Sequence, residues 1–341
     1  MCEGTGGESM SRGQAKLAGA VSLAMLLCWG AVARADQGGV SFWVPGIYAS
    51  MAAVPPDPGF SMPSTFYFYS GKAESSRNFA IGGLIATGVE VKDFEGVFLA
   101  PTWVPEAPVA GGRLALSMMG VVANNEVSAN INFDRIPVSI SRTDDTFGVG
   151  DLYPQASLSW NSGVNNYKLY TTGDIPVGDY DPRRLANIGI GHGAIDWGGA
   201  YTYFDPKTGH ELSATLGFTY NFPNTHSDDY QNGIDMHLDW GASQWLSKTT
   251  MIGVAGYLYD QLTDDTFPTD TPLGQLRERL LDGFRSKVAA VGPQFAHIFE
   301  VGGVPIYTTV RGYHEFWAEN RLKGNDIFLQ AVIPLGGPKE K

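Results

Sequence analysis

Four strand-like segments between Ala194 and Tyr259 constrain the fold more than any other feature of this sequence. Each is about eleven residues long and mixes apolar with polar side chains: Ala194–Phe204, Glu211–Asn221, Asp235–Leu246 and Thr249–Tyr259. A tilted strand needs roughly 9–11 residues to cross a bilayer, so each segment is long enough to do so. Tight turns join the first pair and the last pair, and a longer polar loop separates the pairs. This rhythm predicts an antiparallel β-barrel of the outer-membrane type.

The same alternation of short and long connections continues from Thr65 to Leu335. In such barrels the short connections face the periplasm and the long ones face the outside. We count about twelve strands, an even number that places both ends of the barrel on the periplasmic side. The fold prediction is therefore all-β: a transmembrane antiparallel up-and-down β-barrel over residues 64–336, followed by a tail over residues 337–341.

Two polar stretches leave the strand count open. We interpret Gly71–Gly96 and Ala123–Thr146 mainly as loops, because they carry many polar residues and little alternation. Strands at Leu84–Val91 and Asn130–Ile140 within these stretches would raise the number from twelve to fourteen. The prediction is twelve strands, with fourteen as the alternative.

Composition excludes several other classes of protein. The chain has 341 residues, of which 43 are glycine and only 17% are charged. After residue 35 it contains no apolar run of the ~20 residues that a membrane-spanning helix needs. Its formal net charge of −12, without basic clusters, argues against nucleic-acid binding. Its two cysteines, Cys2 and Cys28, both precede residue 36, so the remaining chain can form neither disulfides nor zinc–thiolate sites.

The first 35 residues resemble a secretion signal. Arg12 and Lys16 form a positive end, Leu17–Trp29 is a short apolar core, and Ala33-Arg34-Ala35 is a small-x-small cleavage site. We therefore predict that residues 1–35 are a cleaved signal peptide. The expected location is the cell outer membrane, after secretion through the inner membrane.

Residues 36–63 differ from the rest of the chain. They are rich in glycine and proline, and prolines interrupt a regular strand ladder. The segment also contains apolar side chains that a free tail would not need: Phe42, Trp43, Ile47 and Tyr48. Two placements remain open. The segment could plug the lumen of the barrel, with these four residues as its anchors, or it could pack against the periplasmic base.

Alternation within the strands predicts which residues face the lumen. Met236, Leu238 and Trp240 share one face of their strand, and His237 and Asp239 share the other. Polar residues at period two should point inward, because a charge that faces lipid near mid-membrane costs about 2–4 kcal/mol for Lys or Arg. The lumen candidates are Lys168, His237, Asp239, Arg311 and Glu315. Aromatic residues near strand ends are candidates for interfacial girdles: Trp103, Trp160, Trp245, Tyr259 and Trp317.

One loop contains a predicted helix. Thr271 is a suitable N-cap and Pro272 a suitable first residue. Apolar residues then follow at helical spacing: Leu273, Leu276, Leu280 and Phe284. The helix could lean over the pore or pack on the rim of the barrel. The other long loops carry paired acids, which could bind divalent cations that bridge lipopolysaccharide or could be ordinary solvated residues: Asp144-Asp145, Asp228-Asp229 and Asp264-Asp265.

No motif in the sequence indicates catalysis. The glycine-rich stretches Gly148–Asp151 and Gly189–Gly193 do not match the nucleotide-binding pattern GxGxxG, and the six histidines include no HExxH zinc motif. We therefore expect no enzyme activity, no cofactor and no metal site. A lipid hydrolase would need a Ser–His pair on one face of the barrel, and the candidates are His237 with Ser243, or His297 with nearby hydroxyls.

Several short motifs occur together over nearly the whole chain after the signal. They are Pro45-Gly46, Phe147–Pro154, Gly173–Asp181, Asn187–Gly189 and Lys207–Ser213. In this combination the sequence resembles the MetA-pathway of phenol degradation family of outer-membrane proteins, which includes a sphingosine-responsive member. The resemblance implies a barrel and a role in the passage of aromatic or other hydrophobic small molecules. It brings no catalytic residues with it.

The resulting functional prediction is a monomeric outer-membrane channel for passive passage of small hydrophobic or aromatic molecules. Its expected partners are the lipid bilayer, lipopolysaccharide, such a small ligand and the outer-membrane assembly machinery. Two alternatives remain: a barrel that captures a lipid such as sphingosine without transporting it, and a lipid hydrolase.

Overall fold

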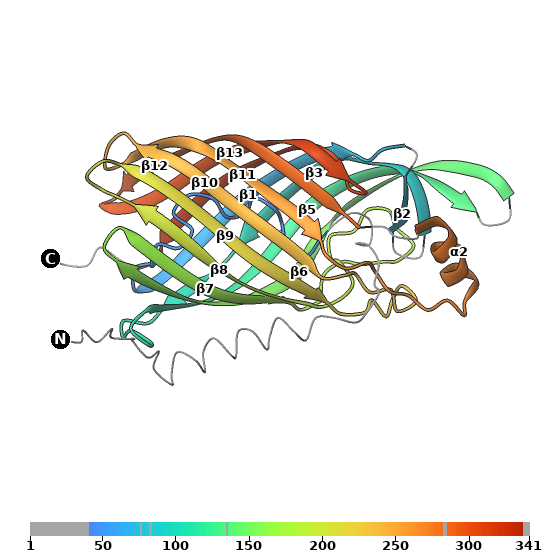
Figure 1. The fold of residues 1–341 in the computed structure, drawn as a ribbon, viewed down its shortest axis with the longest axis horizontal. Helices are drawn as coiled ribbons and strands as arrows, with labels where there is room; N and C mark the ends of the chain where they lie inside the picture. Colours follow the sequence, from blue (N-terminus) through green and yellow to red (C-terminus); the bar gives the residue numbers. More distant parts are fainter. Residues whose placement is uncertain (1–40, 76, 82–83, 134–135, 282–284, 337–341) are drawn as a thin grey trace, which may run out of the picture. The chain divides into compact units, whose positions relative to one another are not determined.

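A computed structural model describes residues 41–75, 77–81, 84–133, 136–281 and 285–336 (Figure 1). The predicted signal peptide, residues 1–35, and the predicted tail, residues 337–341, lie outside the described residues. None of the described helices is long and apolar enough to cross a membrane. Within these described ranges the fold is a sheet with a single short helix, α2 (Pro272–Leu281).

Fourteen strands form one antiparallel sheet. They are β1 (Gly59–Lys72), β2 (Asn78–Ile81), β3 (Leu84–Leu99), β4 (Thr102–Val104), β5 (Arg113–Phe133), β6 (Ile136–Ser162), β7 (Asn165–Asp174), β8 (Ala194–Phe204), β9 (His210–Asn221), β10 (Asp235–Trp245), β11 (Thr250–Gln261), β12 (Lys287–Val301), β13 (Val304–Glu319) and β14 (Lys323–Pro334).

The sheet closes on itself through its first and last strands. β1 pairs with β14 from Ser61, opposite Pro334, to Lys72, opposite Lys323. From β5 to β14 each strand pairs with its neighbour in sequence, and β3 joins β1 to β5. β4 pairs with β1 just beyond the point where β3 ends, so the two strands occupy one position in the wall. Among the described strands, β2 pairs only with β3. The closed wall therefore has twelve strands with two extra ones, which confirms the predicted barrel.

Strands β3, β5 and β6 are longer than the sequence indicated. β5 and β6 pair from Arg113, opposite Ser159, as far as Phe133, opposite Ile136. The predicted strand Leu84–Val91 is confirmed within β3, but the predictions of loops over Gly71–Gly96 and Ala123–Thr146 were wrong. In Figure 1 the β5–β6 hairpin projects past the other strands. The extended part of β5 does alternate, with Val127, Ala129 and Ile131 buried, so the prediction missed a strand whose intervening residues are polar.

The start of β1 also differs from the expected boundary. β1 begins at Gly59, inside the range predicted to be free of strands, and it includes Pro63. Beside Pro63, the hydrogen-bond ladder that joins β1 to β3 and β4 is interrupted. The interruption lies between Leu99, the last paired residue of β3, and Thr102, the first of β4. Proline lacks a backbone N–H and is tolerated where a ladder is interrupted. The interruption thus allows the first strand to include a proline.

Side chains alternate between a lipid-type outer face and a buried inner face. On β9, Leu212, Leu216 and Tyr220 are exposed, whereas Ser213 and Thr215 are buried. The outer surface carries apolar residues on many strands, including Phe66, Leu169, Ile195, Trp197, Val254, Val310 and Ile327. Among the predicted girdle residues, Trp103 and Trp317 are exposed, but Tyr259 is fully buried and packs under Arg321. Tyr259 thus belongs to the inner face, because the alternation of β11 places it there.

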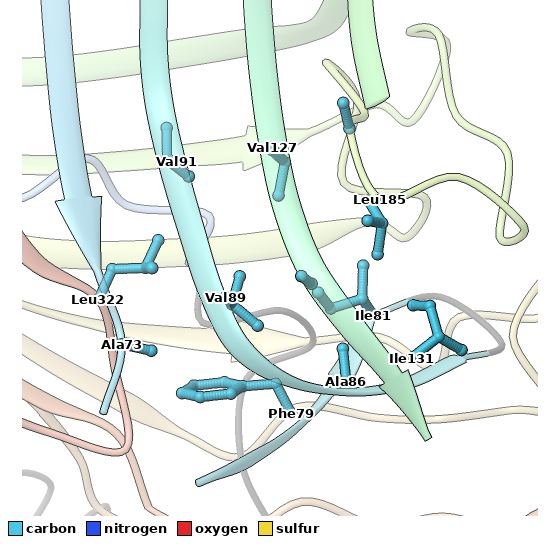
Figure 2. Packing of buried hydrophobic residues seen from close by; sticks show 12 residues of the cluster. Ala73, Phe79, Ile81, Ala86, Val89, Val91, Val127, Ile131, Leu185 and Leu322 are labelled. Carbon is cyan, nitrogen blue, oxygen red and sulfur yellow. The ribbon is translucent and has the colours of Figure 1, made fainter. Parts of the chain in front are cut away.

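An apolar cluster lies beside β3 and β5. Figure 2 shows its buried side chains on these strands, on the short β2 and on three connections, and its labelled members are Ala73, Phe79, Ile81, Ala86, Val89, Val91, Val127, Ile131, Leu185 and Leu322. The loop residue Leu185 lies next to the strand residues, which brings the long β7–β8 connection over the inner wall. The cluster therefore joins the projecting strands to that loop.

The predicted helix is confirmed, with a different buried face. The Thr271 hydroxyl accepts a hydrogen bond from the Gly274 N–H at 3.0 Å, as an N-cap does. The buried residues of α2 are Gly274, Arg277 and Leu281, whereas Leu280 is exposed. Arg277 donates to the backbone oxygen and the hydroxyl of Ser227, which anchors the helix to the preceding loop. Of the predicted apolar stripe, Leu273 and Leu276 are partly buried, Leu276 packs in a cluster with Leu281, and Phe284 lies outside the described residues.

Closure of the ring can be tested by cross-linking, because Cys2 and Cys28 are the only cysteines of the chain. Phe66 of β1 lies opposite Leu329 of β14, and both are exposed. Aligned antiparallel residues have Cα atoms about 4.5–5.5 Å apart, within the range of a disulfide. We expect Phe66→Cys with Leu329→Cys to oxidise to a bond between β1 and β14, detected as altered mobility on a non-reducing gel.

The matched control is Phe66→Cys with Val332→Cys. Val332 is aligned with Pro63, so it is offset from Phe66 by about 10 Å along the strand. Equal cross-linking of both pairs, or of neither, would contradict the register that closes the barrel.

Candidate functional site

Residues 41–58 contain no strand and pass through the inside of the barrel. Trp43, Ala49 and Ala53 are buried, and the segment contacts inward-facing residues of strands from β7 to β13. Gly46 has a φ of +82°, and a Cβ there would come within 2.8 Å of the Tyr257 ring. A Cβ on the wall residue Gly241 would come within 2.6 Å of the Ser50 nitrogen. The segment and the wall therefore approach so closely that both surfaces need a glycine.

Two carboxylates of the wall bind backbone N–H groups of this segment. Asp239 on β10 accepts from Gly46 N at 2.9 Å and from Tyr48 N at 3.2 Å. Glu211 on β9 accepts from Met51 N at 3.0 Å and from the Ser243 hydroxyl at 2.6 Å. Hydrogen bonds to a charged acceptor are stronger than neutral ones. These two acids therefore serve as the main attachment points of the segment.

Neutral and cationic side chains of the wall bind other atoms of the segment. The Arg311 guanidinium donates to the Ile47 carbonyl at 3.0 Å, and the Tyr313 hydroxyl donates to the Gly46 carbonyl at 3.2 Å. On the other side, the Thr202 hydroxyl accepts from Ala53 N at 3.0 Å. The backbone of the segment is thus satisfied by side chains of the wall, as a buried irregular chain requires.

Trp43 covers a buried pair on the inner wall. Its ring stacks on His237, with centroids 3.7 Å apart and planes 13° apart. His237 Nε2 lies 3.0 Å from Asp196 Oδ2 and 3.3 Å from the Tyr170 hydroxyl. His237 and Asp196 are fully buried. The predicted lumen residue His237 and the predicted anchor Trp43 therefore meet directly.

The structure brings the other predicted residues to the same interior. The Lys168 ammonium lies 5.3 Å from the centroid of the Tyr48 ring, and Arg311 lies 5.2 Å from that of Phe328. Glu315 lies further along β13, where it accepts from the hydroxyls of Tyr257 at 3.0 Å and Tyr69 at 3.1 Å. Lys168, His237, Asp239 and Arg311 thus surround the segment directly, whereas Glu315 belongs to a separate polar group.

Above the segment lies an apolar cavity of about 220 Å³. Phe42, Trp43 and Val44 form its floor, and its walls come from β1, β3, β5, β6 and the β7–β8 loop. The apolar lining includes Val89, Val91, Phe94, Phe98, Val121, Val127 and Ile188. Polar atoms are concentrated at a few positions, among them Asn125, Glu315 and Arg321. A largely apolar cavity with few polar groups is typical of a small-molecule site.

The β7–β8 loop is held over the cavity by a buried carboxylate. Asp151 on β6 accepts from Gly178 N at 2.7 Å and from Ile190 N at 2.8 Å. A Cβ on Gly178 would come within 2.5 Å of the backbone of Gly150, so the loop needs a glycine at this contact. The motifs Phe147–Pro154 and Gly173–Asp181 therefore build the attachment of the loop that carries cavity residues.

Two adjacent residues of this loop, Tyr180 and Asp181, lie in different environments. Burial is the main cause that raises the pKa of the Tyr180 phenol, while its hydrogen bond from Asn224 lowers it. Tyr180 lines the cavity and remains a neutral hydroxyl at physiological pH. The hydrogen bond from the Arg183 side chain lowers the pKa of the Asp181 carboxyl, which stays ionised.

The paired acids of the long connections mostly bind other protein groups. Asp144, which lies in β6 rather than in a loop, accepts from the Arg142 guanidinium at 2.7 Å. Asp264 pairs with Arg285, and Asp265 is buried and accepts from the Tyr230 hydroxyl. Within the described residues no group of three or more His, Cys, Asp or Glu side chains could hold a metal ion.

Sequence reasoning missed several residues that bind the segment or line the cavity. Glu211 and Thr202 lie on strands with regular alternation, so the sequence could have predicted that their side chains point inward. Nothing in the sequence indicated that they bind the backbone of a distant segment. The cavity residue Val127 was missed because its stretch was interpreted as a loop, and Val89 was missed although it lies in the alternative strand Leu84–Val91.

Known structures share this fold. The crystal structure of the COG4313 outer membrane channel from Pseudomonas putida F1 is similar with a TM-score of 0.59 and 14% identity, covering 85% of this chain and 99% of that one. A Pseudomonas aeruginosa FadL homologue gives a TM-score of 0.40 and 9% identity, covering 90% and 99%. The first similarity supports the barrel fold, and the second is too weak to support more.

Sequence comparison gives a more specific result. No curated protein matches this sequence significantly. A family model described as "Putative MetA-pathway of phenol degradation" matches residues 75–331, which include every wall strand from β3 to β13. Because the match extends over most of the chain, the protein belongs to the MetA-pathway of phenol degradation family.

Proposed function

We propose that this protein is an outer-membrane channel that admits small hydrophobic molecules, including single aromatic rings, without chemical change. The observation that carries the proposal is the apolar cavity of about 220 Å³ whose floor is formed by Phe42 and Trp43. An engineered apolar cavity of about 150 Å³ binds benzene, so this one has room for one substituted ring. The aromatic lining favours such a guest through offset and edge-to-face ring contacts.

The family and the fold support the same proposal. The family is described by a phenol degradation pathway, and the barrel with a TM-score of 0.59 is an outer membrane channel. The apolar outer surface suits insertion as a monomer into the outer membrane, where the long loops meet lipopolysaccharide. Assembly machinery for such barrels and a signal peptide over residues 1–35 belong to the same proposal.

Residues 41–58 act as the gate in this proposal. They occupy the lumen below the cavity, and Asp239 and Glu211 hold them through backbone N–H groups. Passage toward the periplasm requires these bonds to break, which makes the anchors Phe42, Trp43, Ile47 and Tyr48 part of the gate. Lys168, His237, Asp239 and Arg311 then face the freed lumen.

The second candidate is a barrel that captures a lipid or another amphiphile without transport. The closed floor of the cavity favours it, because a bound molecule would meet the buried Trp43–His237 stack. A lipid hydrolase has less support, because the hydrogen-bond partners of His237 in the described chain are Asp196 and Tyr170, not a serine. Flux of a bound aromatic molecule would separate the channel from the capture protein.

Filling the cavity tests its role in binding. Val121 on β5 is buried and lines the cavity, so Val121→Trp should lower the affinity for a small aromatic probe such as toluene at least about tenfold. Val122 is the next residue and is 43% exposed on the outer face, so Val122→Trp is a matched control. Isothermal titration of the detergent-solubilised protein measures both. Equal affinity in the two variants would remove the cavity from the proposal.

Loosening the gate tests the role of residues 41–58. Asp239→Asn replaces one acceptor oxygen with an amino group that faces a backbone N–H, and an unsatisfied buried N–H costs about 1–3 kcal/mol. The open probability in a planar bilayer should rise roughly tenfold. The control is Asp326→Asn, because Asp326 is also buried on the inner wall but binds Tyr257 instead of the segment. A similar rise in both variants would argue against the gate.

A further inference from the structure

The inner wall carries many more carboxylates than cations. Eight buried acids lie on its strands: Asp151, Asp174, Asp196, Glu211, Asp235, Asp239, Glu315 and Asp326. The basic side chains that face the same interior from the strands are those of Lys168 and Arg311, along with the imidazole of His237. Carboxyl groups therefore clearly outnumber basic side chains on the inner wall.

Among the described residues neither strand cation forms an ion pair with these acids, although Arg311 is close enough to Asp239 and Asp326 to act on them electrostatically. Lys168 lies over the Tyr48 ring, and Arg311 donates to the Ile47 carbonyl and lies over Phe328. In the described part of the chain, one of six wall acids lies within ion-pair distance of a basic side chain. That acid is Asp196, whose partner is His237, and the other five are Asp174, Asp239, Glu211, Glu315 and Asp326. The negative charge of the wall is thus balanced mainly by hydrogen-bond donors.

Asp174 has no such donor. It is the last residue of β7, is 8% exposed, and both of its carboxylate oxygens are buried without a hydrogen-bond partner. One oxygen each of Asp196 and Asp326 is also buried and unpartnered. Isolated buried carboxylates are unfavourable unless a positive group meets them. Asp174 faces the interior near Asp196, which lies on the adjacent strand opposite Thr172.

We propose that the inner wall is a pathway for small cations, which pass in preference to anions when residues 41–58 are displaced. Rings and rows of Asp and Glu side chains make pores selective for cations, because they concentrate cations and repel anions. Displacement of the segment also removes the N–H donors that now bind Asp239 and Glu211. Those two acids then join Asp174 and Asp196 in facing the freed space.

This second pathway complements the proposed function and rests on its displaceable gate. The apolar cavity suits uncharged rings, whereas the carboxyl groups of Asp239 and Glu211 beside the segment suit hydrated ions once the segment is displaced. The two proposals can fail separately. Loss of aromatic binding in titration would refute the hydrophobic ligand, and it would leave the ion selectivity of the lumen unchanged.

The test is the reversal potential of the full-length protein in planar bilayers under a tenfold KCl gradient. The wild type is compared with a gate-loosened background, Thr202→Val with Tyr313→Phe, which removes two uncharged contacts of the segment. The expected potassium-to-chloride permeability ratio is about five or more. Adding Asp174→Asn should lower that ratio about twofold, and this substitution breaks no hydrogen bond.

The matched control is Asp270→Asn, which removes the same charge from an exposed loop position. It should leave the permeability ratio unchanged. Asp196→Asn provides a second lumen variant, and heat-dependent gel mobility shows that each variant is folded. A ratio near or below one, an equal effect of Asp174→Asn and Asp270→Asn, or absence of potassium current in every protein would overturn the proposal.

Discussion

The pairing of β1 with β14 is the constraint on which the rest of the structure depends. In hydrocarbon, backbone N–H and C=O groups that lack partners are strongly unfavourable, so a spanning sheet must close. Twelve aligned positions from Ser61 to Lys72 complete that closure. Once the ring is closed, the period of two along each strand divides the side chains into those that face lipid and those that face the lumen. Every feature of the interior follows from that division.

The interior combines two environments within one wall. The upper part is apolar and aromatic, and the lower part is lined by carboxylates that accept hydrogen bonds from an irregular backbone segment. Asp239 and Glu211 are buried without an ion-pair partner, which would be unfavourable for an isolated carboxylate. Each accepts two or more hydrogen bonds, and these bonds offset the cost of burial. Phe42 and Trp43 mark the boundary, since they form the floor of the cavity and cover His237 beneath it.

Where the bilayer dictates the pattern, the fold could be predicted from the sequence. The strands of Ala194–Tyr259, the inward direction of His237 and Asp239, and the capped helix at Thr271 all have local signals. The projecting parts of β3, β5 and β6 extend beyond the length that crosses a bilayer, so bilayer-crossing length does not predict them, even though one face of β5 is buried there. The partners of residues 41–58 lack local signals, since an acid that binds a backbone N–H some 160 to 193 positions away looks like any other inward acid. The cavity was missed for the first of these reasons, and Glu211 for the second.

The long sequence separation of those contacts has a consequence for the order of folding. Gly46 is joined to Asp239 across 193 positions and to Tyr313 across 267. The entropy lost on closing a loop grows with its length, and contacts this distant form late. Residues 41–58 precede the barrel strands in the chain, yet their docking surface exists only after β8 to β13 have assembled. The first described part of the chain can therefore reach its native contacts only once the strands that follow it are in place.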